Sequence, residues 1–196
     1  MTNPRVINFK KTAKAVVFAM TLSLLVPLSL TKSHALTAAE GYVNKLSNSV
    51  LVAANAGKKS QFRSLMNRHA DIATIGLFSL GPYAKKLPTN QRRQYYRLVE
   101  NWIAKTFISY SKGLGGQKFK ITGSSARGNT ITLVKSKIVG GSNAPVKWRL
   151  IKHKDSYLVS DVNVAGVWLS ILMKSKFVAK LAKHDGDFNR LFAYLR

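Results

Sequence analysis

The chain has 196 residues, of which 32 are lysine or arginine and only seven are aspartate or glutamate, so its net charge is +25. It has no cysteine, which excludes disulfide bonds, so a packed core or a bound ligand must stabilise the fold. The basic residues are scattered along the chain and accompany no zinc-finger spacing, helix-turn-helix pattern or aromatic RNA-binding strand, which argues against a nucleic-acid partner.

The first 35 residues have the three parts of a secretory signal peptide. Basic residues precede an apolar run over residues 15–30, and a small-x-small sequence ends at Ala35. A membrane anchor is the alternative, but this run of 16 residues is shorter than the ~20 that span a bilayer, and Pro27 interrupts it. We therefore expect residues 1–35 to be a cleaved Sec signal peptide and residues 36–196, with a net charge of +20, to form a single exported domain.

The first part of this domain has helical periodicity. Residues 37–40, with the sequence TAAE, fit a capping box at the start of a helix that we expect to end near Gly57. Two shorter helices are expected over residues 61–67 and 72–80. The longest helix is expected over residues 88–113, because apolar side chains recur there on one broad stripe.

From residue 118 onward the apolar residues recur with a period of two. Four strands are expected, at residues 118–122, 130–139, 146–150 and 157–164, joined by short turns. Short connections between successive strands are typical of an antiparallel meander with one dry face and one solvated face.

Two more helices are expected after the strands. One is expected over residues 167–181, and Asp185 is expected to cap a last short helix. The order of helices, strands and helices predicts an α+β fold, in which a four-stranded antiparallel meander sheet is covered on one face by the N- and C-terminal helices.

Few side chains of residues 36–196 are suited to catalysis. The histidines have no metal-binding spacing and occur in unrelated segments, at His69, His153 and His184. Most acidic residues fit helix caps or turns, and the remaining carboxylates are in no spacing that favours a catalytic pair: Glu100, Asp161 and Asp187. We therefore expect no enzymatic activity, no metal and no cofactor.

Apolar side chains dominate the faces that should point inward. They fit either a filled core or an apolar cavity between the sheet and the helices, and periodicity alone does not distinguish the two. A dry cavity of this kind would suit acyl chains. The candidate cavity residues are Phe78, Tyr83, Val99, Trp102, Ile103, Phe107, Phe119, Ile121, Val146, Trp148, Leu150, Val167, Leu169 and Leu172.

Several short motifs, in their order and spacing, resemble the MlaC family of toluene-tolerance periplasmic lipid-binding proteins, which has a paralogous branch linked to hopanoids. The motifs are Asp71-Ile72, Leu80-Gly81-Pro82-Tyr83, Thr89-Asn90-Gln91-Arg92, Asp161-Val162 and Gly166-Val167. The resemblance extends over nearly all of residues 36–196. The departures from the family pattern gather where the last strand meets the next helix, for example at Trp168, where the family has serine.

The resemblance implies a periplasmic carrier that binds phospholipid acyl chains in the cavity. It would shuttle lipid between an outer-membrane lipoprotein–porin complex and an inner-membrane ABC transporter with an MCE-domain subunit, and so maintain outer-membrane lipid asymmetry. Lipid is then cargo rather than a cofactor, and we expect a monomer. Asp161 is expected to accept hydrogen bonds at the junction of strand and helix, where Gly166, which lacks a Cβ, permits a close turn.

Three alternatives to a phospholipid carrier remain open. The first is a carrier of a hopanoid or another polycyclic lipid, and the second is a ligand-free basic envelope adaptor with a filled core. The third is an envelope enzyme, which would need an acid–base set that the sequence does not show. Basic residues expected near the mouth of the cavity would dock on acidic partners or bilayers, and the candidates are Lys85, Lys86, Arg92 and Arg93.

Overall fold

The computed structural model describes residues 36–110 and 116–196. The proposed signal peptide and the expected helix end at Gly113 lie outside these residues. Among the residues described, no helix is both long enough and apolar enough to cross a bilayer.

Helix α1 (Ala38–Asn55) begins at the predicted capping box. The Thr37 hydroxyl accepts a hydrogen bond from the Glu40 backbone N–H at 3.3 Å, and the Glu40 carboxylate accepts one from the Thr37 N–H at 2.9 Å. Two N–H groups that the helix leaves without partners are thereby satisfied. A cap of this kind contributes about 1 kcal/mol and fixes the first residue of the helix.

The next helices are short and lead to the longest one. They are α2 (Lys59–His69), α3 (Ile72–Ser79), the 3-10 turns η1 (Gly81–Lys86) and η2 (Thr89–Gln91), and α4 (Arg92–Tyr110). Asp71 caps α3, because its carboxylate accepts hydrogen bonds from the backbone N–H and the hydroxyl of Thr74. The predicted helices are therefore present, with their ends shifted by a few residues.

The sheet has five strands and not the four that the sequence predicts. They are β1 (Lys118–Arg127), β2 (Ile131–Val139), β3 (Pro145–His153), β4 (Ser156–Val164) and β5 (Val167–Trp168), antiparallel and in the order of the chain.

The fifth strand exists because a two-residue turn follows β4. Ala165 and Gly166 both have a positive φ, 50° and 93°, as a type I′ hairpin turn requires. The turn sends the chain back along β4, and Val167 pairs with Val164. Helix α5 (Leu169–Ala182) therefore begins two residues later than predicted.

The last helix, α6 (Phe188–Leu195), is capped by Asp187 and not by the predicted Asp185. The Asp187 carboxylate accepts a hydrogen bond from the Asn189 N–H at 2.8 Å. Asp185 itself has a positive φ of 51° in the preceding turn.

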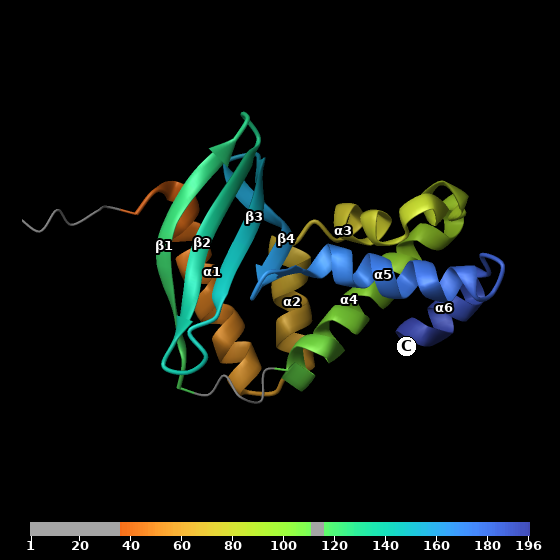
Figure 1. The fold of residues 1–196 in the computed structure, drawn as a ribbon, viewed down its shortest axis with the longest axis horizontal. Coiled ribbons are helices and arrows are strands. Elements are labelled where there is room, and N and C mark those ends of the chain that lie inside the picture. The colour runs from red at the N-terminus through yellow and green to blue at the C-terminus, as the bar shows by residue number, and fades with distance from the viewer. Residues whose placement is uncertain (1–35, 111–115) are drawn as a thin grey trace, which may run out of the picture. The chain divides into compact units, whose positions relative to one another are not determined.

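The helices pack in two groups (Figure 1). Helix α1 packs on β1 and β2, whereas α2, α3 and α5 reach β4. Helices α3, α4, α5 and α6 pack on one another beyond β4. Helix α4 packs on α2 along one side and on α3 and α6 along another. Its buried side chains therefore face either the space next to α2 or the helices beyond β4.

Candidate functional site

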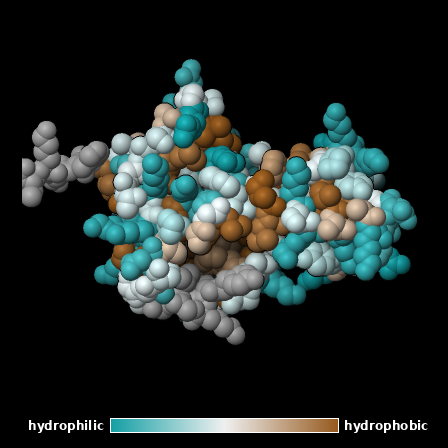
Figure 2. All heavy atoms as spheres, viewed as in Figure 1, coloured by the Kyte–Doolittle hydropathy of each residue, from teal (hydrophilic) through white to brown (hydrophobic). Residues whose placement is uncertain are grey.

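A cavity of about 380 Å³ lies between the sheet and the helices. Thirteen of its fourteen lining residues are apolar, and the remaining one is a threonine. Val164 and Val167 belong to the lining and are 46% and 55% exposed, so the cavity reaches the surface at this end of the sheet. Figure 2 shows hydrophobic residues inside a hollow on the face of the molecule that it views. The lining consists of Val50, Phe62, Ile103, Thr106, Phe107, Phe119, Ile138, Val146, Trp148, Val162, Val164, Val167, Leu169 and Leu172.

The strand register builds one wall of the cavity. Phe119 of β1 stands directly opposite Ile138 of β2, and the inward residues of β3 come next. The Trp148 ring meets Phe119 edge-on, with 5.7 Å between ring centroids. The Trp148 indole N–H donates to the Ser136 hydroxyl at 3.0 Å, so its one polar atom is satisfied within the sheet. The ring therefore presents hydrocarbon to the cavity without leaving a buried donor unpaired.

Helices α2 and α4 form the facing wall. Ile103 and Phe107 are four residues apart on α4 and thus lie on the same face of the helix. The Phe107 ring stacks on Phe62 of α2, with 4.1 Å between centroids and 8° between planes. This stack closes the gap between the two helices beside the cavity.

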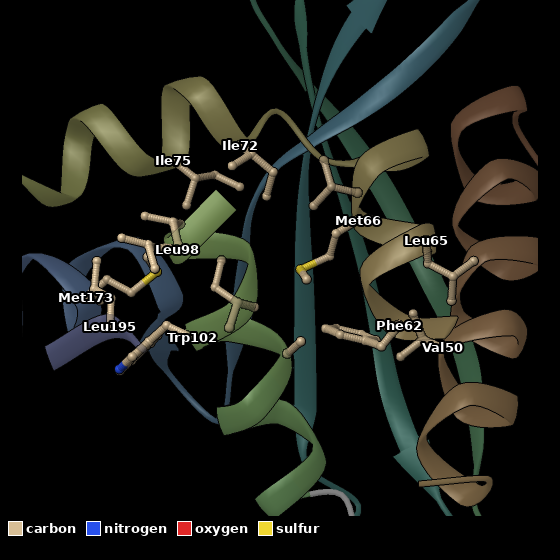
Figure 3. Close-up of a cluster of buried hydrophobic side chains, with 14 of the residues drawn as sticks. Val50, Phe62, Leu65, Met66, Ile72, Ile75, Leu98, Trp102, Met173 and Leu195 are labelled. Atoms are coloured by element: carbon tan, nitrogen blue, oxygen red, sulfur yellow. The ribbon is translucent and has the colours of Figure 1, made fainter. Parts of the chain in front are cut away.

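A smaller space of about 90 Å³ continues the cavity toward α3. The two spaces share the lining residues Val50, Phe62, Ile103, Trp148, Val162 and Leu169, so they adjoin. Leu65, Met66, Ile72 and Ile75 extend the lining inward. In Figure 3, Phe62 and Met66 point from α2 into the space beside α4, while Ile72 and Ile75 approach from α3.

The inner space also has polar groups in its lining, His69 and Asp161. A hydrogen bond of 3.0 Å joins the His69 Nδ1 to the Tyr42 hydroxyl. Burial, and then the nearby charge of Arg68, lower the pKa of His69, and burial raises the pKa of Tyr42 to about 12. Both side chains are therefore predominantly neutral near pH 7, and neither brings a net charge to the apolar space.

Asp161 holds the junction between β4 and α5. Its carboxylate is only 2% exposed and accepts hydrogen bonds from the backbone N–H of Ser170, at 3.1 Å, and from the Ser170 hydroxyl. The Arg149 guanidinium forms an ion pair with it at 3.3 Å. Because no side chain at the N-cap position satisfies the first turn of α5, Asp161 supplies an acceptor from the neighbouring strand.

Trp168, the departure from the resembled family, does not line either space. Its ring lies 4.2 Å from the guanidinium carbon of Arg149, on the outer side of the junction. Trp168 thus covers the partner of Asp161, and it does not reshape the cavity.

Eight of the fourteen predicted cavity residues line the larger space. They are Ile103, Phe107, Phe119, Val146, Trp148, Val167, Leu169 and Leu172. The structure does not bring the other six to it, namely Phe78, Tyr83, Val99, Trp102, Ile121 and Leu150.

Four of these six residues are on α3, η1 and α4, and they lie among the helices that pack on one another beyond β4. Trp102 is buried with its ring edge against Phe177 of α5, on the side of α4 away from α2 (Figure 3). Val99 is fully buried, whereas Phe78 is 45% exposed beneath the Lys174 ammonium. Tyr83 packs under Lys86 on η1.

Six lining residues do not appear among the predicted ones: Val50, Phe62, Thr106, Ile138, Val162 and Val164. For three of them the sequence carries a usable signal, because alternation places Ile138 on the same face as Val134, and Val162 and Val164 on one face of β4. The pairing of Val162 with Trp148 and of Val164 with Val146 follows only from the register. Phe62 has no comparable signal, since its helix is short and mostly polar.

Within residues 36–110 and 116–196, no three His, Asp or Glu side chains gather as metal ligands would. The carboxylates left open by the sequence have structural partners: Glu100 pairs with Arg63 at 3.6 Å, Asp161 holds α5, and Asp187 caps α6.

The basic residues expected at the mouth of the cavity lie elsewhere. Lys85 and Lys86 belong to η1, which packs on α3 and α5. Arg92 and Arg93 are in the first turn of α4, about three turns before the cavity residues of that helix.

Known proteins resemble the chain both in family profile and in fold. The family profile described as "MlaC protein" matches residues 39–196. Among solved structures, the fold is similar to that of a phospholipid-binding protein from Ralstonia solanacearum, determined in complex with a phospholipid. The TM-score is 0.69 and the identity 19%, over 81% of this chain and 95% of that one. No curated protein matches the chain.

Proposed function

Because the chain belongs to the MlaC family, we propose that it is a carrier that binds phospholipid acyl chains in the cavity between sheet and helices. The observation that carries this proposal is the cavity itself, which is bounded by apolar side chains and reaches the surface beside Val164 and Val167. The phospholipid bound by the Ralstonia protein supports the same class of cargo for a chain of similar fold.

The size of the cavity favours a carrier over a ligand-free adaptor. Ligand-binding pockets typically measure about 300–1,000 Å³. The larger space has about 380 Å³ and the adjoining inner space about 90 Å³, so the interior is not filled by side chains alone. An adaptor with a filled core would have neither space.

The energetics of the cavity determine how cargo is released. Each methylene group transferred from water to an apolar environment contributes about 0.8 kcal/mol. Burial of a dozen methylenes therefore stabilises a complex by about 10 kcal/mol before the costs of ordering the lipid. Spontaneous release into water is slow on this scale, so a carrier must deliver its lipid to another apolar site.

The wider pathway is part of the same proposal. The protein would be exported by its N-terminal Sec signal, act as a monomer in the periplasm, and exchange lipid with membrane complexes. One would be an outer-membrane lipoprotein–porin complex, and the other an inner-membrane ABC transporter with an MCE-domain subunit. The family membership, the signal-like first 35 residues and the apolar cavity support this assignment. No catalytic step is required, because a carrier changes no bond.

Native mass spectrometry of the protein purified without delipidation tests the proposal. The expected result is a bound phospholipid, whereas a bound polycyclic lipid would change the cargo but not the carrier function. Repeated preparations without lipid, combined with no uptake from vesicles, would refute it.

A pair of neighbouring variants locates the cargo. Leu172 lines the cavity, whereas Ile171 is 51% exposed and lies outside the lining. Leu172→Asp is expected to lose most of the bound lipid because it places a charge in the apolar space, and Ile171→Asp is expected to retain it. Equal lipid content in the two folded variants would show that the cargo lies elsewhere.

A further inference from the structure

The outer face of the sheet carries lysines that stand directly opposite one another. Lys120 of β1 is the register partner of Lys137 of β2, and Lys135 is the partner of Lys147 of β3. Lys118 lies on the same face, two residues before Lys120. All five side chains are exposed. The Cβ atoms of directly opposed residues are about 4.5–5.5 Å apart, so these like charges repel each other and destabilise the sheet.

The fold does not relieve this repulsion within the part of the chain that the structure describes. The ion pairs found there join Arg63 to Glu100 and Arg149 to Asp161, and they involve none of the five lysines. The segments of β1, β2 and β3 contain no acidic residue at all. The lysine face, defined as Lys118, Lys120, Lys135, Lys137 and Lys147, therefore has no anionic partner of its own in the sheet.

The lysine face lies at the end of the sheet where the cavity reaches the surface. Lys118 and Lys120 flank Phe119 in β1, and Lys137 precedes Ile138 in β2. Successive residues of a strand point to opposite faces of the sheet, so these lysines lie on the face opposite to Phe119 and Ile138. Phe119 and Ile138 line the cavity, so the same strand ends present hydrocarbon inward and ammonium groups outward. Val164 and Val167, both about half exposed, add apolar side chains at the rim.

From this arrangement we propose that the lysine face and the two rim valines dock directly on the surface of an anionic lipid bilayer, with the mouth of the cavity beside the contact. Lysines near such a surface bind its phosphates through charge, and their long stems let the ammonium groups reach the headgroups while the stems lie on apolar surface. Exposed aliphatic side chains beside the charges suit the boundary between headgroups and acyl chains.

The composition of this surface favours a bilayer over an acidic protein. Protein–protein interfaces are enriched in arginine and aromatic residues and depleted in lysine. The five residues of the lysine face are all lysines, and the apolar residues at the rim are valines. The neighbouring Arg149 is already paired with Asp161 and with the Trp168 ring. This docking goes beyond the proposed carrier function, because it depends on surface residues and would bring the cavity to a membrane without a protein intermediary.

Sedimentation with lipid vesicles tests the docking. The purified protein is mixed with vesicles of phosphatidylcholine alone or of phosphatidylcholine with phosphatidylglycerol. The variant Lys137→Glu/Lys147→Glu converts both opposed pairs into pairs of opposite charge, Lys120 with position 137 and Lys135 with position 147. Its thermal unfolding midpoint is therefore expected to equal or exceed that of the original protein, so loss of folding would not explain loss of binding.

A control with the same change in net charge is Lys85→Glu/Lys86→Glu, located on η1 away from the sheet. We expect the original protein to bind the anionic vesicles only, with affinity that decreases as salt increases. Each basic residue near an anionic surface strengthens binding about fivefold, so the sheet variant should lose at least about tenfold, while the control should change much less.

Three results would overturn the docking proposal. They are no binding of the original protein to anionic vesicles, equal losses in the two variants, and unchanged vesicle binding by the sheet variant. The last result, together with loss of function in cells, would assign the lysine face to an acidic protein. Native mass spectrometry of the same samples separates the two proposals, because an empty cavity with intact vesicle binding would refute the carrier and leave the docking standing.

Discussion

Removal of the Asp161 carboxylate tests how the junction between β4 and α5 is held. In Asp161→Ala, the Ser170 N–H and hydroxyl both lose their acceptor, and Ser170 is only 5% exposed. An unsatisfied buried donor costs about 1–3 kcal/mol, whereas the half-exposed Arg149 guanidinium can be hydrated instead. We therefore expect the free energy of unfolding to decrease by about 3 kcal/mol.

Urea denaturation followed by far-UV circular dichroism measures this change. The midpoint should shift at nearly constant slope, which indicates a change in stability and not in the extent of unfolding. Ser170→Ala removes only the hydroxyl donor and should cost about 1 kcal/mol. Asp155→Ala, an exposed carboxylate in the turn between β3 and β4, is the matched control and should cost less than about 0.5 kcal/mol.

The reasoning fails if Asp161→Ala and Asp155→Ala have the same small effect. It also fails if the double variant Asp161→Ala/Ser170→Ala shows simple additivity, because groups joined by a hydrogen bond should be coupled by about 0.5–3 kcal/mol.

Three further changes probe the junction and the inner space. Ala165→Asn should raise the free energy of unfolding by about 0.5–1 kcal/mol, since asparagine tolerates the positive φ of this turn better than alanine, and a lower urea midpoint would contradict the assigned turn. Trp168→Ala should lower stability by about 0.5–1 kcal/mol through the lost contact with Arg149 and leave lipid content unchanged, so an emptied cavity would show that the ring reaches the cargo. His69 has a lowered pKa in the folded protein, so protonation favours the unfolded chain and stability should decrease as the pH drops below about 6.5. His69→Gln should weaken that pH dependence in urea midpoints measured from pH 8 to pH 5, and an unchanged dependence would assign it to other groups.

Local signals in the sequence predict most of the secondary structure. The TAAE capping box marks the first residue of α1, and the alternation of lysines with Phe119 and Ile121 identifies β1. Strand β5 has only two residues, which is too few to show any periodicity. It also depends on a positive φ at Ala165, and alanine is not a residue from which a positive φ would be predicted. Asp185 and Asp187 both precede the last helix, and only the backbone geometry decides which of them caps it.

The cavity is only partly predictable because α4 is buried on two sides. Trp102 and Ile103 are adjacent in the sequence, and both are apolar and buried. Successive residues of a helix differ by about 100° in direction, so Ile103 faces the cavity while Trp102 packs against Phe177. Periodicity shows that both side chains are inside, but tertiary packing decides which one meets cargo.

The lysine face, like the cavity, can be predicted only in part from the sequence. Alternation predicts that Lys120, Lys135, Lys137 and Lys147 lie on the solvated face of the sheet. That they form directly opposed pairs follows from the strand register, which the sequence alone does not specify. The repulsion and the proposed docking surface become visible only with the fold.

The three tryptophans allow a direct test of whether hydrocarbon occupies the cavity, since only Trp148 lines it, while Trp102 and Trp168 do not. The measurement is quenching of tryptophan fluorescence by a phospholipid with brominated acyl chains, because bromine quenches at contact. The carrier account predicts that Trp148→Phe abolishes most of the quenching, whereas Trp102→Phe and Trp168→Phe retain it. Undiminished quenching in Trp148→Phe, or none in the original protein, would contradict it.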